Sequence, residues 1–125
     1  MAKQTVEVSC ANVLILTKVG TLGAAQNVTL ALVVPHSLIM DYVRCYAKTP
    51  PSGSDIIVDV NKNGSTIFTT QANRPTVPNG LNKGNISATP DIPSLAEGDV
   101  ITLDIDQVGS STPGADLTVE VRCMQ

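Results

Sequence analysis

The chain has 125 residues, a net charge of −3 and an isoelectric point of about 4.8, and this length fits one domain spanning residues 1–125. Apolar residues make up 42% of it but aromatic residues only 2%, with one Phe and no Trp. Val, Ile and Leu must therefore build the core. Because the chain has neither a Lys/Arg cluster nor stacking aromatics, we expect no nucleic-acid partner.

The sequence also argues against membrane insertion and export. Residues 1–13 lack the apolar core of a signal peptide. The most apolar stretch, 28–40, is interrupted by Thr, Pro, His and Ser and is shorter than the ~20 residues that span a bilayer. We expect a soluble protein with no membrane partner. The three cysteines, Cys10, Cys45 and Cys123, show no C-x-x-C spacing, so we expect small buried side chains in a reducing compartment rather than zinc ligands.

The first half of the chain predicts four strands. The second is short and apolar, and the third is a nearly continuous apolar run, typical of a central strand, that Pro35 ends. The fourth alternates, with Val43, Cys45 and Ala47 as its inner face. The first is an edge strand or part of an N-terminal arm, residues 1–11. In order, the four are Thr5–Val8, Val13–Leu16, Val28–Val34 and Leu38–Ala47.

Residues 55–70 predict a hairpin. Ile56, Val58 and Val60 alternate with Asp55, Ile57 and Asp59 before Lys62-Asn63-Gly64-Ser65, and Thr66–Thr69 returns. Asn-Gly accepts the positive φ angles that a tight hairpin turn requires.

The last third of the chain combines a long loop with two alternating strands. The loop, Gln71–Pro93, holds a short strand at Asn85–Ala88, and a single helical turn follows at Pro93–Glu97. Val100–Val108 and Asp116–Cys123 alternate apolar and polar side chains as half-buried strands do. Seven or eight short strands with turns between them predict an all-β fold, a single-domain antiparallel β-sandwich of jelly-roll type.

One segment resembles half of a calcium-binding loop. Asp59-Val60-Asn61-Lys62-Asn63-Gly64 matches D-x-[DN]-x-[DN]-G, but Thr70 stands where the loop needs a bidentate Glu, and a strand precedes it instead of a helix. We interpret it as a polar hairpin turn. A weak ion site that uses Asp59 and Asn61 stays open.

The sequence offers no catalytic constellation, and we expect no enzyme, no cofactor and no metal site. His36 is the single histidine and reads as a turn residue after Pro35, and no G-x-S-x-G or phosphate-binding glycine motif is present. The acidic residues belong on the wet faces of strands, where Arg44 and Arg122 can pair with them. These acids are Asp59, Asp104, Asp106, Asp116 and Glu120.

Two stretches carry a resemblance to a known class of domain. They are Asp55–Thr70 with Gln71–Pro75, and Leu95–Ser110 running into Gly114–Arg122. Together they resemble β-sandwich domains in virion proteins of tailed bacteriophages, which occur on tail fibres, on other tail proteins and as small capsid decoration or cement proteins. The resemblance covers roughly residues 38–122. It implies a jelly-roll-like sandwich, often a homotrimer, held on a larger protein lattice, and it brings no catalytic or contact residues.

The resemblance leads us to expect a capsid decoration protein that binds the lattice of the major capsid protein, stabilises the head and is assembled into the virion in the host cytoplasm. No shaft accompanies the predicted domain, which favours a small accessory clamp. Residues 1–11 are either an arm for strand addition to a neighbour or a frayed terminus. The alternative is a tail or tail-fibre module that binds a host receptor or glycan, although only Tyr42, Tyr46 and Phe68 are available to stack on sugars.

Overall fold

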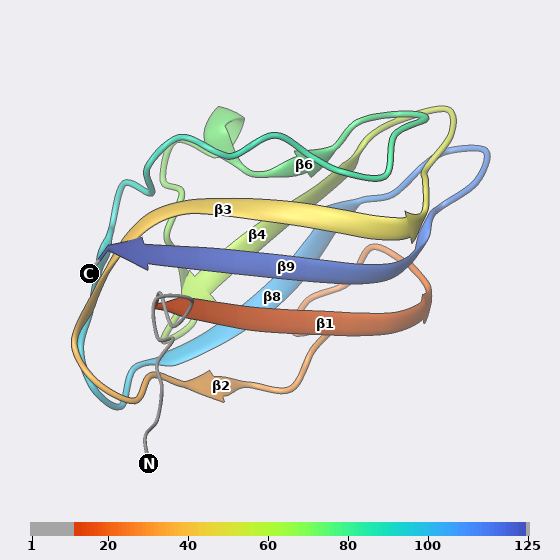
Figure 1. Ribbon diagram of the computed structural model, residues 1–125. Helices are drawn as coiled ribbons and strands as arrows, with labels where there is room; N and C mark the ends of the chain where they lie inside the picture. The colour runs from red at the N-terminus through yellow and green to blue at the C-terminus, as the bar shows by residue number, and fades with distance from the viewer. Residues whose placement is uncertain (1–11, 125) are drawn as a thin grey trace, which may run out of the picture.

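A computed structural model describes residues 12–124, which form nine β-strands in two antiparallel sheets (Figure 1). Residues 1–11, with the predicted arm, the strand at Thr5–Val8 and Cys10, lie outside the described residues. Sheet A has the order β1-β9-β3-β7, and sheet B has the order β2-β8-β4-β5, with β6 also paired to β4. The strands are β1 (Val13–Thr21), β2 (Leu32–Val33), β3 (Leu38–Thr49), β4 (Ile56–Lys62), β5 (Ser65–Thr66), β6 (Thr76–Val77), β7 (Ser94–Leu95), β8 (Val100–Gln107) and β9 (Ala115–Met124).

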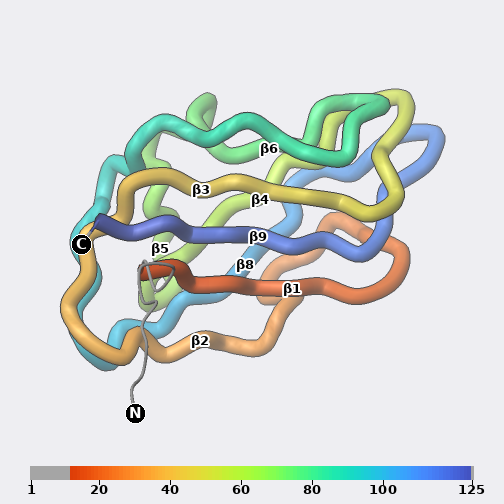
Figure 2. The backbone as a smooth tube through the Cα atoms, in the orientation of Figure 1, coloured from red at the N-terminus to blue at the C-terminus, as the bar shows by residue number. Residues whose placement is uncertain are grey.

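The connectivity is that of a long hairpin rolled into two layers. The first half of the chain pairs with the second half in reverse order: β1 with β9, β2 with β8, β3 with β7, and β4 with both β5 and β6. Further pairs, β3 with β9 and β4 with β8, close the two sheets. Figure 2 shows the two layers crossing, with β1, β9 and β3 in front of β8 and β4. This pairing is a jelly roll and confirms the predicted fold class.

Alternation along the strands builds the core between the sheets. On β9, Leu117, Val119, Val121 and Cys123 are buried, and the residues between them are not. The same two-residue period buries Ile101, Leu103 and Ile105 on β8. Successive side chains of a strand point to opposite faces, so each sheet contributes one apolar face. The buried side chains of both sheets form one cluster.

The predicted hairpin is confirmed at its turn and shorter than predicted on its return. Asn63 (φ 51°) and Gly64 (φ 87°) both take positive φ between β4 and β5, as a type I′ turn requires. Thr66 Oγ1 donates to Asp59 Oδ1 at 2.6 Å and accepts from the amide of Phe68 at 2.9 Å. These bonds turn the chain inward after Thr66, so Ile67 and Phe68 enter the core instead of extending the strand.

The prediction of a central strand at Val28–Val34 is wrong. Only Leu32–Val33 is strand, and β2 lies at the edge of sheet B. Leu30 is 92% exposed and Val33 62% exposed. Asn27 has a φ of 51°, which interrupts the extended backbone just before the segment. An apolar run indicates burial only when a second neighbour covers it, and this segment has β8 alone.

Around Leu95, a strand replaces the predicted helical turn at Pro93–Glu97. Leu95 lies opposite Leu38 and is 3% exposed, so packing against the core holds Ser94–Leu95 extended as β7. A tight turn follows at 96–99, where the amide of Asp99 donates to the carbonyl of Ala96. Residues 85–88 form no strand, although the amide of Ser87 donates to Val43 at 2.9 Å.

Two of the nine strands, β6 and β7, lie where the sequence predicted no strand, and each is only two residues long. Pairs this short leave no alternation in the sequence from which to predict them.

Leu103→Ala is expected to lower the free energy of unfolding by about 2–5 kcal/mol, because Leu103 is 0% exposed and its truncation leaves a cavity. Leu81→Ala removes the same atoms from a side chain that is 54% exposed and is expected to change it by no more than about 0.5 kcal/mol. Urea unfolding followed by circular dichroism measures both, and equal losses would contradict this core assignment.

Candidate interaction surfaces

The half calcium loop does not assemble a ligand set. Asp59 accepts hydrogen bonds from Thr66 and from Gln71 Nε2. Asn61 Nδ2 donates to Asp104 Oδ2 at 2.9 Å, and the side chain of Asn63 bonds Asp99 and the amide of Val100. Each side chain of the motif therefore serves a different neighbour. Residues 12–124 contain no group of three or more His, Cys, Asp or Glu side chains arranged to hold a metal ion.

The acidic side chains on sheet B are tied into the fold. Asp104 Oδ1 accepts from the amide of Asn27 at 2.9 Å, and Asp106 forms a 2.7 Å ion pair with Arg74. Burial raises the pKa of Asp59 above its ordinary value of 3.8, against the opposing hydrogen bonds from Thr66 and Gln71.

Two further acids cap turns. Hydrogen bonds from the amide of Ala96 and from Asn63 Nδ2 lower the pKa of Asp99 below 3.8, and a bond from the amide of Thr70 lowers the pKa of Asp91. On sheet A, Asp116 takes a φ of 57° and accepts from the amide of Gly20 at 2.7 Å. These carboxylates stabilise turns and do not flank a common cleft.

The single histidine and the described cysteines occupy the places predicted for them. His36 is exposed in a bend after β2, with Nδ1 3.2 Å from the carbonyl oxygen of Ser37. Cys45 and Cys123 are buried, free thiols. Burial raises the pKa of Cys45 to about 12 and also raises that of Cys123.

The outer face of sheet A carries an unusual combination of side chains for an exposed surface. Inner positions on β3 and β9 are buried, so the alternate positions form the outer face, and the register places them side by side. Tyr46 is 47% exposed, Met124 48% and Ile39 43%. We call this set the sheet A face: Ile39, Tyr42, Arg44, Tyr46, Glu120, Arg122 and Met124.

At the centre of the sheet A face, two arginines flank one tyrosine. The guanidinium carbons of Arg44 and Arg122 each lie 5.9 Å from the centroid of the Tyr42 ring, within cation–π range. Arg122 approaches Glu120 only to 4.0 Å, and Arg44 makes no ion pair among the described residues. The Nε atoms of both arginines are buried without a hydrogen-bond partner in residues 12–124. Cation–π contacts with the Tyr42 ring thus hold two guanidinium groups on the outer face of sheet A.

The outer face of sheet B differs in kind. None of the exposed large hydrophobic side chains of residues 12–124 belongs to β4 or β8, whereas five belong to β1, β3 and β9. Its polar groups are paired with one another, as Asn61 is with Asp104. The outer faces of the two sheets therefore differ in chemistry. Polar side chains on sheet B bond one another, whereas sheet A exposes apolar and cationic side chains.

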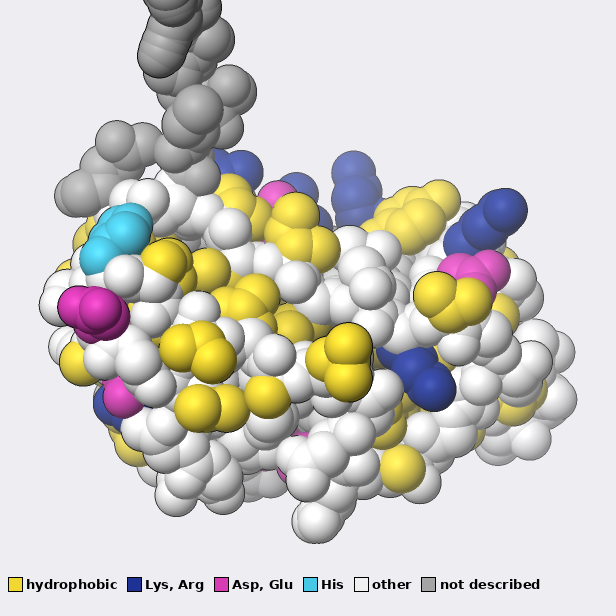
Figure 3. Space-filling view, turned by 90° about the horizontal axis from the view of Figure 1, so that it is seen from below, with side chains coloured by type: hydrophobic (Ala, Val, Ile, Leu, Met, Phe, Trp, Pro, Cys, Tyr) yellow, Lys and Arg dark blue, Asp and Glu magenta, His cyan; other side chains and the backbone are white. Residues whose placement is uncertain are grey.

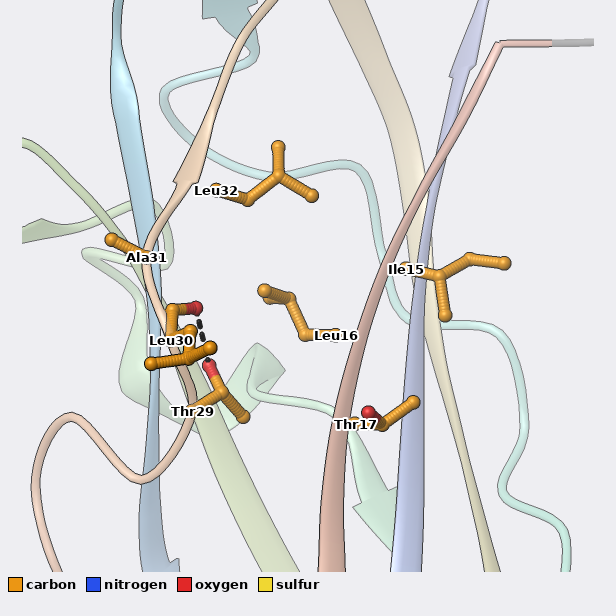
Figure 4. A pocket seen from close by; sticks show the side chains of 7 residues that line it. All are labelled: Ile15, Leu16, Thr17, Thr29, Leu30, Ala31 and Leu32. Atoms are coloured by element: carbon orange, nitrogen blue, oxygen red, sulfur yellow. Dashed lines mark hydrogen bonds between the residues drawn. The ribbon is translucent and has the colours of Figure 1, made fainter.

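A second apolar surface runs along the side of the sandwich where β1 and β2 lie. Ile15 (54% exposed), Val19 (81%), Leu30 and Val33 form it, and we call these four residues the β1–β2 edge. Figure 3 looks at this side and shows hydrophobic side chains spread across it. A groove of about 280 Å³ separates β1 from residues 29–32. Leu16 and Leu32 point into the groove, whereas Ile15 and Thr17 point away from it (Figure 4).

Neither the sheet A face nor the β1–β2 edge was predicted from the sequence. Of the three rings that the sequence offers for stacking on sugars, Phe68 is buried in the core, and Tyr42 and Tyr46 lie on the sheet A face. The signal available was the alternation Tyr42, Arg44, Tyr46 on the face opposite the predicted inner residues of β3; Ile39 joins this face through the bulge between Met40 and Tyr42. For the β1–β2 edge the signal was the near absence of charge between residues 12 and 35.

Comparison with models of known protein families, with curated proteins and with solved structures finds no match in any of the three. Within residues 12–124, no helix is long and apolar enough to cross a membrane.

The carboxyl groups of Asp59 and Asp99 are expected to titrate on opposite sides of 3.8, because burial disfavours the charged form of one and hydrogen bonds favour that of the other. The contribution of Asp99 to stability is complete above pH 3.8 and is lost as the pH falls through its lowered pKa; the contribution of Asp59 falls as the pH rises through its raised pKa. Carbon-detected NMR of the side-chain carboxyls measures both midpoints. Two midpoints at 3.8 would contradict this account.

Cys45 is expected to stay unmodified by iodoacetamide at pH 8 in the native protein, because its thiol is buried and its pKa is about 12. Peptide mass spectrometry before and after addition of guanidinium measures the modification. The exposed loop variant Ser111→Cys is the control and is expected to react at once. Rapid labelling of native Cys45 would contradict its burial.

Proposed function

We propose that this protein is a structural protein of a tailed-bacteriophage virion, a capsid decoration protein that binds the lattice of the major capsid protein and stabilises the head. Binding occurs through the sheet A face, and no catalytic step is involved. The observation that carries the proposal is the cluster on that face, where Tyr42, Arg44 and Arg122 lie among exposed apolar side chains. Tyr, Arg and Met are the residues that protein–protein interfaces enrich.

The scaffold suits a clamp on a large assembly. The sheet A face is built on β3 and β9, which are twelve and ten residues long and pair along most of their length. The backbone of paired strands is already ordered, so no interaction energy is spent on ordering a loop when the face binds. Weak contacts repeated over a symmetric shell then add through avidity.

The guanidinium groups of Arg44 and Arg122 define the chemistry of the partner. A surface that meets them must supply carboxylate or carbonyl oxygens, because guanidinium groups donate hydrogen bonds and accept none. The proposal therefore includes a dependence of shell binding on ionic strength.

Arg44→Glu and Tyr46→Ala are each expected to weaken binding to empty shells of the major capsid protein about 10-fold or more, because the first reverses a charge at the centre of the face and the second removes an exposed ring from the face. Cosedimentation of labelled protein with the shells measures the affinity. Lys62→Glu makes the same charge change on β4 of the other sheet and is the matched control. Full affinity in both face variants would contradict this docking surface.

The location in the virion is tested separately by the copy number in purified particles. Hundreds of copies per particle are expected for a decoration protein, whereas a few or a dozen would favour the tail. Binding of the protein to purified host glycan, with none to shells, would replace the decoration role by that of a tail or fibre module.

A further inference from the structure

Strand β1 presents a long backbone edge without a neighbour among the described residues. The amide of Cys123 donates to the carbonyl of Asn12 at 2.8 Å, which sets the pattern of the β1–β9 ladder. In an antiparallel pair the residues that bond the neighbour alternate with residues whose N–H and C=O point away. Residues 13, 15, 17 and 19 therefore direct their backbone groups outward. No backbone hydrogen bond from elsewhere in residues 12–124 reaches them.

The other long strands have covered edges. The amide of Gly84 donates to Cys45 on β3, and that of Val28 donates to Leu103 on β8, each at 2.9 Å. The free side of β4 pairs with β5 and β6. Only β1 leaves an edge of nine residues without such cover in the described part of the chain.

This edge carries a single one of the charged side chains that usually protect a free strand. Natural sheets block edge pairing with charged side chains, proline or bulges. Between residues 12 and 35 the single charged residue is Lys18. Depletion of charge is also the mark of the central part of a protein interface. The amino-acid composition of this edge is therefore typical of a protein–protein interface and not of a strand edge that faces solvent.

We propose that β1 pairs antiparallel with β1 of a second copy of this chain, around a two-fold axis beside Leu16. This register sets Val13 opposite the partner's Val19 and Ile15 opposite the partner's Thr17. It matches every outward-directed residue of the strand with an outward-directed residue of the other copy. The bulge between Lys18 and Thr21 ends the pairing.

The same operation also covers apolar side chains on the β2 side of the edge. A two-fold axis that pairs strands antiparallel in one sheet is perpendicular to that sheet, so both copies of sheet B lie on the same side of the joined sheet A. The two β2 segments then face each other, and Leu30 and Val33 of each copy meet apolar surface beside the groove lined by Leu16 and Leu32. Both halves of the contact come from one uncharged surface, which is the condition for a self-complementary interface. A second copy supplies that surface without any further partner.

Sedimentation equilibrium of the full chain is expected to show a dimer. A two-fold contact through β1 replaces the trimer that the resemblance implies, because a strand edge cannot pair with itself around a three-fold axis. A monomer at high concentration, or a trimer, would overturn the proposal.

Thr17→Pro is expected to convert the dimer to a monomer without unfolding it, because the lost N–H points away from β9 and edge strands accept proline at such positions. Thr17→Val keeps the N–H and the strand propensity and is expected to stay a dimer.

Leu30→Lys is expected to weaken the dimer at least 10-fold, and Leu81→Lys, at an exposed apolar residue outside the edge, is expected to leave it unchanged. Thermal melts check folding. A dimeric and folded Thr17→Pro variant would refute the pairing.

Amide exchange tests the strand pairing itself. The amides of Ile15, Thr17 and Val19 are expected to be protected at dimer concentrations and to exchange at least 10-fold faster after dilution to the monomer, whereas those of Leu14 and Leu16, bonded to β9, stay protected. Protection that does not change with concentration would show that a segment of the same chain covers β1 and would overturn the proposal. Shell binding of Thr17→Pro separates the two proposals, because the sheet A face is unchanged in that variant.

Discussion

The burial of alternate Val, Ile and Leu side chains between two sheets is the interaction on which the rest of the structure depends. β9 shows it best, because it lies between β1 and β3 and directs Leu117, Val119 and Val121 toward sheet B. With one Phe in the chain, the core consists of branched aliphatic side chains that fit a pleated surface. Each inward residue then leaves an outward neighbour free to set the chemistry of a face.

The two layers use that freedom differently. Sheet B turns its outward positions into a polar network in which Asn61, Asp59 and Asp104 bind neighbours within the fold. Sheet A instead exposes Tyr46 and Met124 and keeps the guanidinium donors of Arg44 without partners in the described residues. Exposed apolar groups gain from burial against a partner, which is why both proposed contacts lie on sheet A, one on its outer face and one at its β1 edge.

The elements with strict alternation were predictable from the sequence, and the others were not. β8, β9 and the Asn63-Gly64 turn follow from a period of two and from the demand for positive φ. The prediction of a central strand at Val28–Val34 was wrong because an apolar run does not reveal whether one or two strands will flank it. The strand at Ser94–Leu95 was not predicted because only tertiary contact with Leu38 holds this segment extended. The sheet A face and the β1–β2 edge were not predicted because apolar residues occur on both faces of β1 and β3. The sequence alone therefore could not distinguish core residues from surface residues.

The rolled-hairpin connectivity has a consequence for the order of assembly. Within residues 12–124, the first strand, β1, has no sheet neighbour other than the last, β9, and Asn12 bonds a residue 112 positions away. Contacts this distant in sequence slow the search for the native state, since loop closure must precede the gain from packing. During translation β1 leaves the ribosome before β9 and can pair only after most of the domain has been made. Residues 12–35, in which Lys18 is the single charged residue, are therefore exposed during that interval, when chaperones and premature association compete for them.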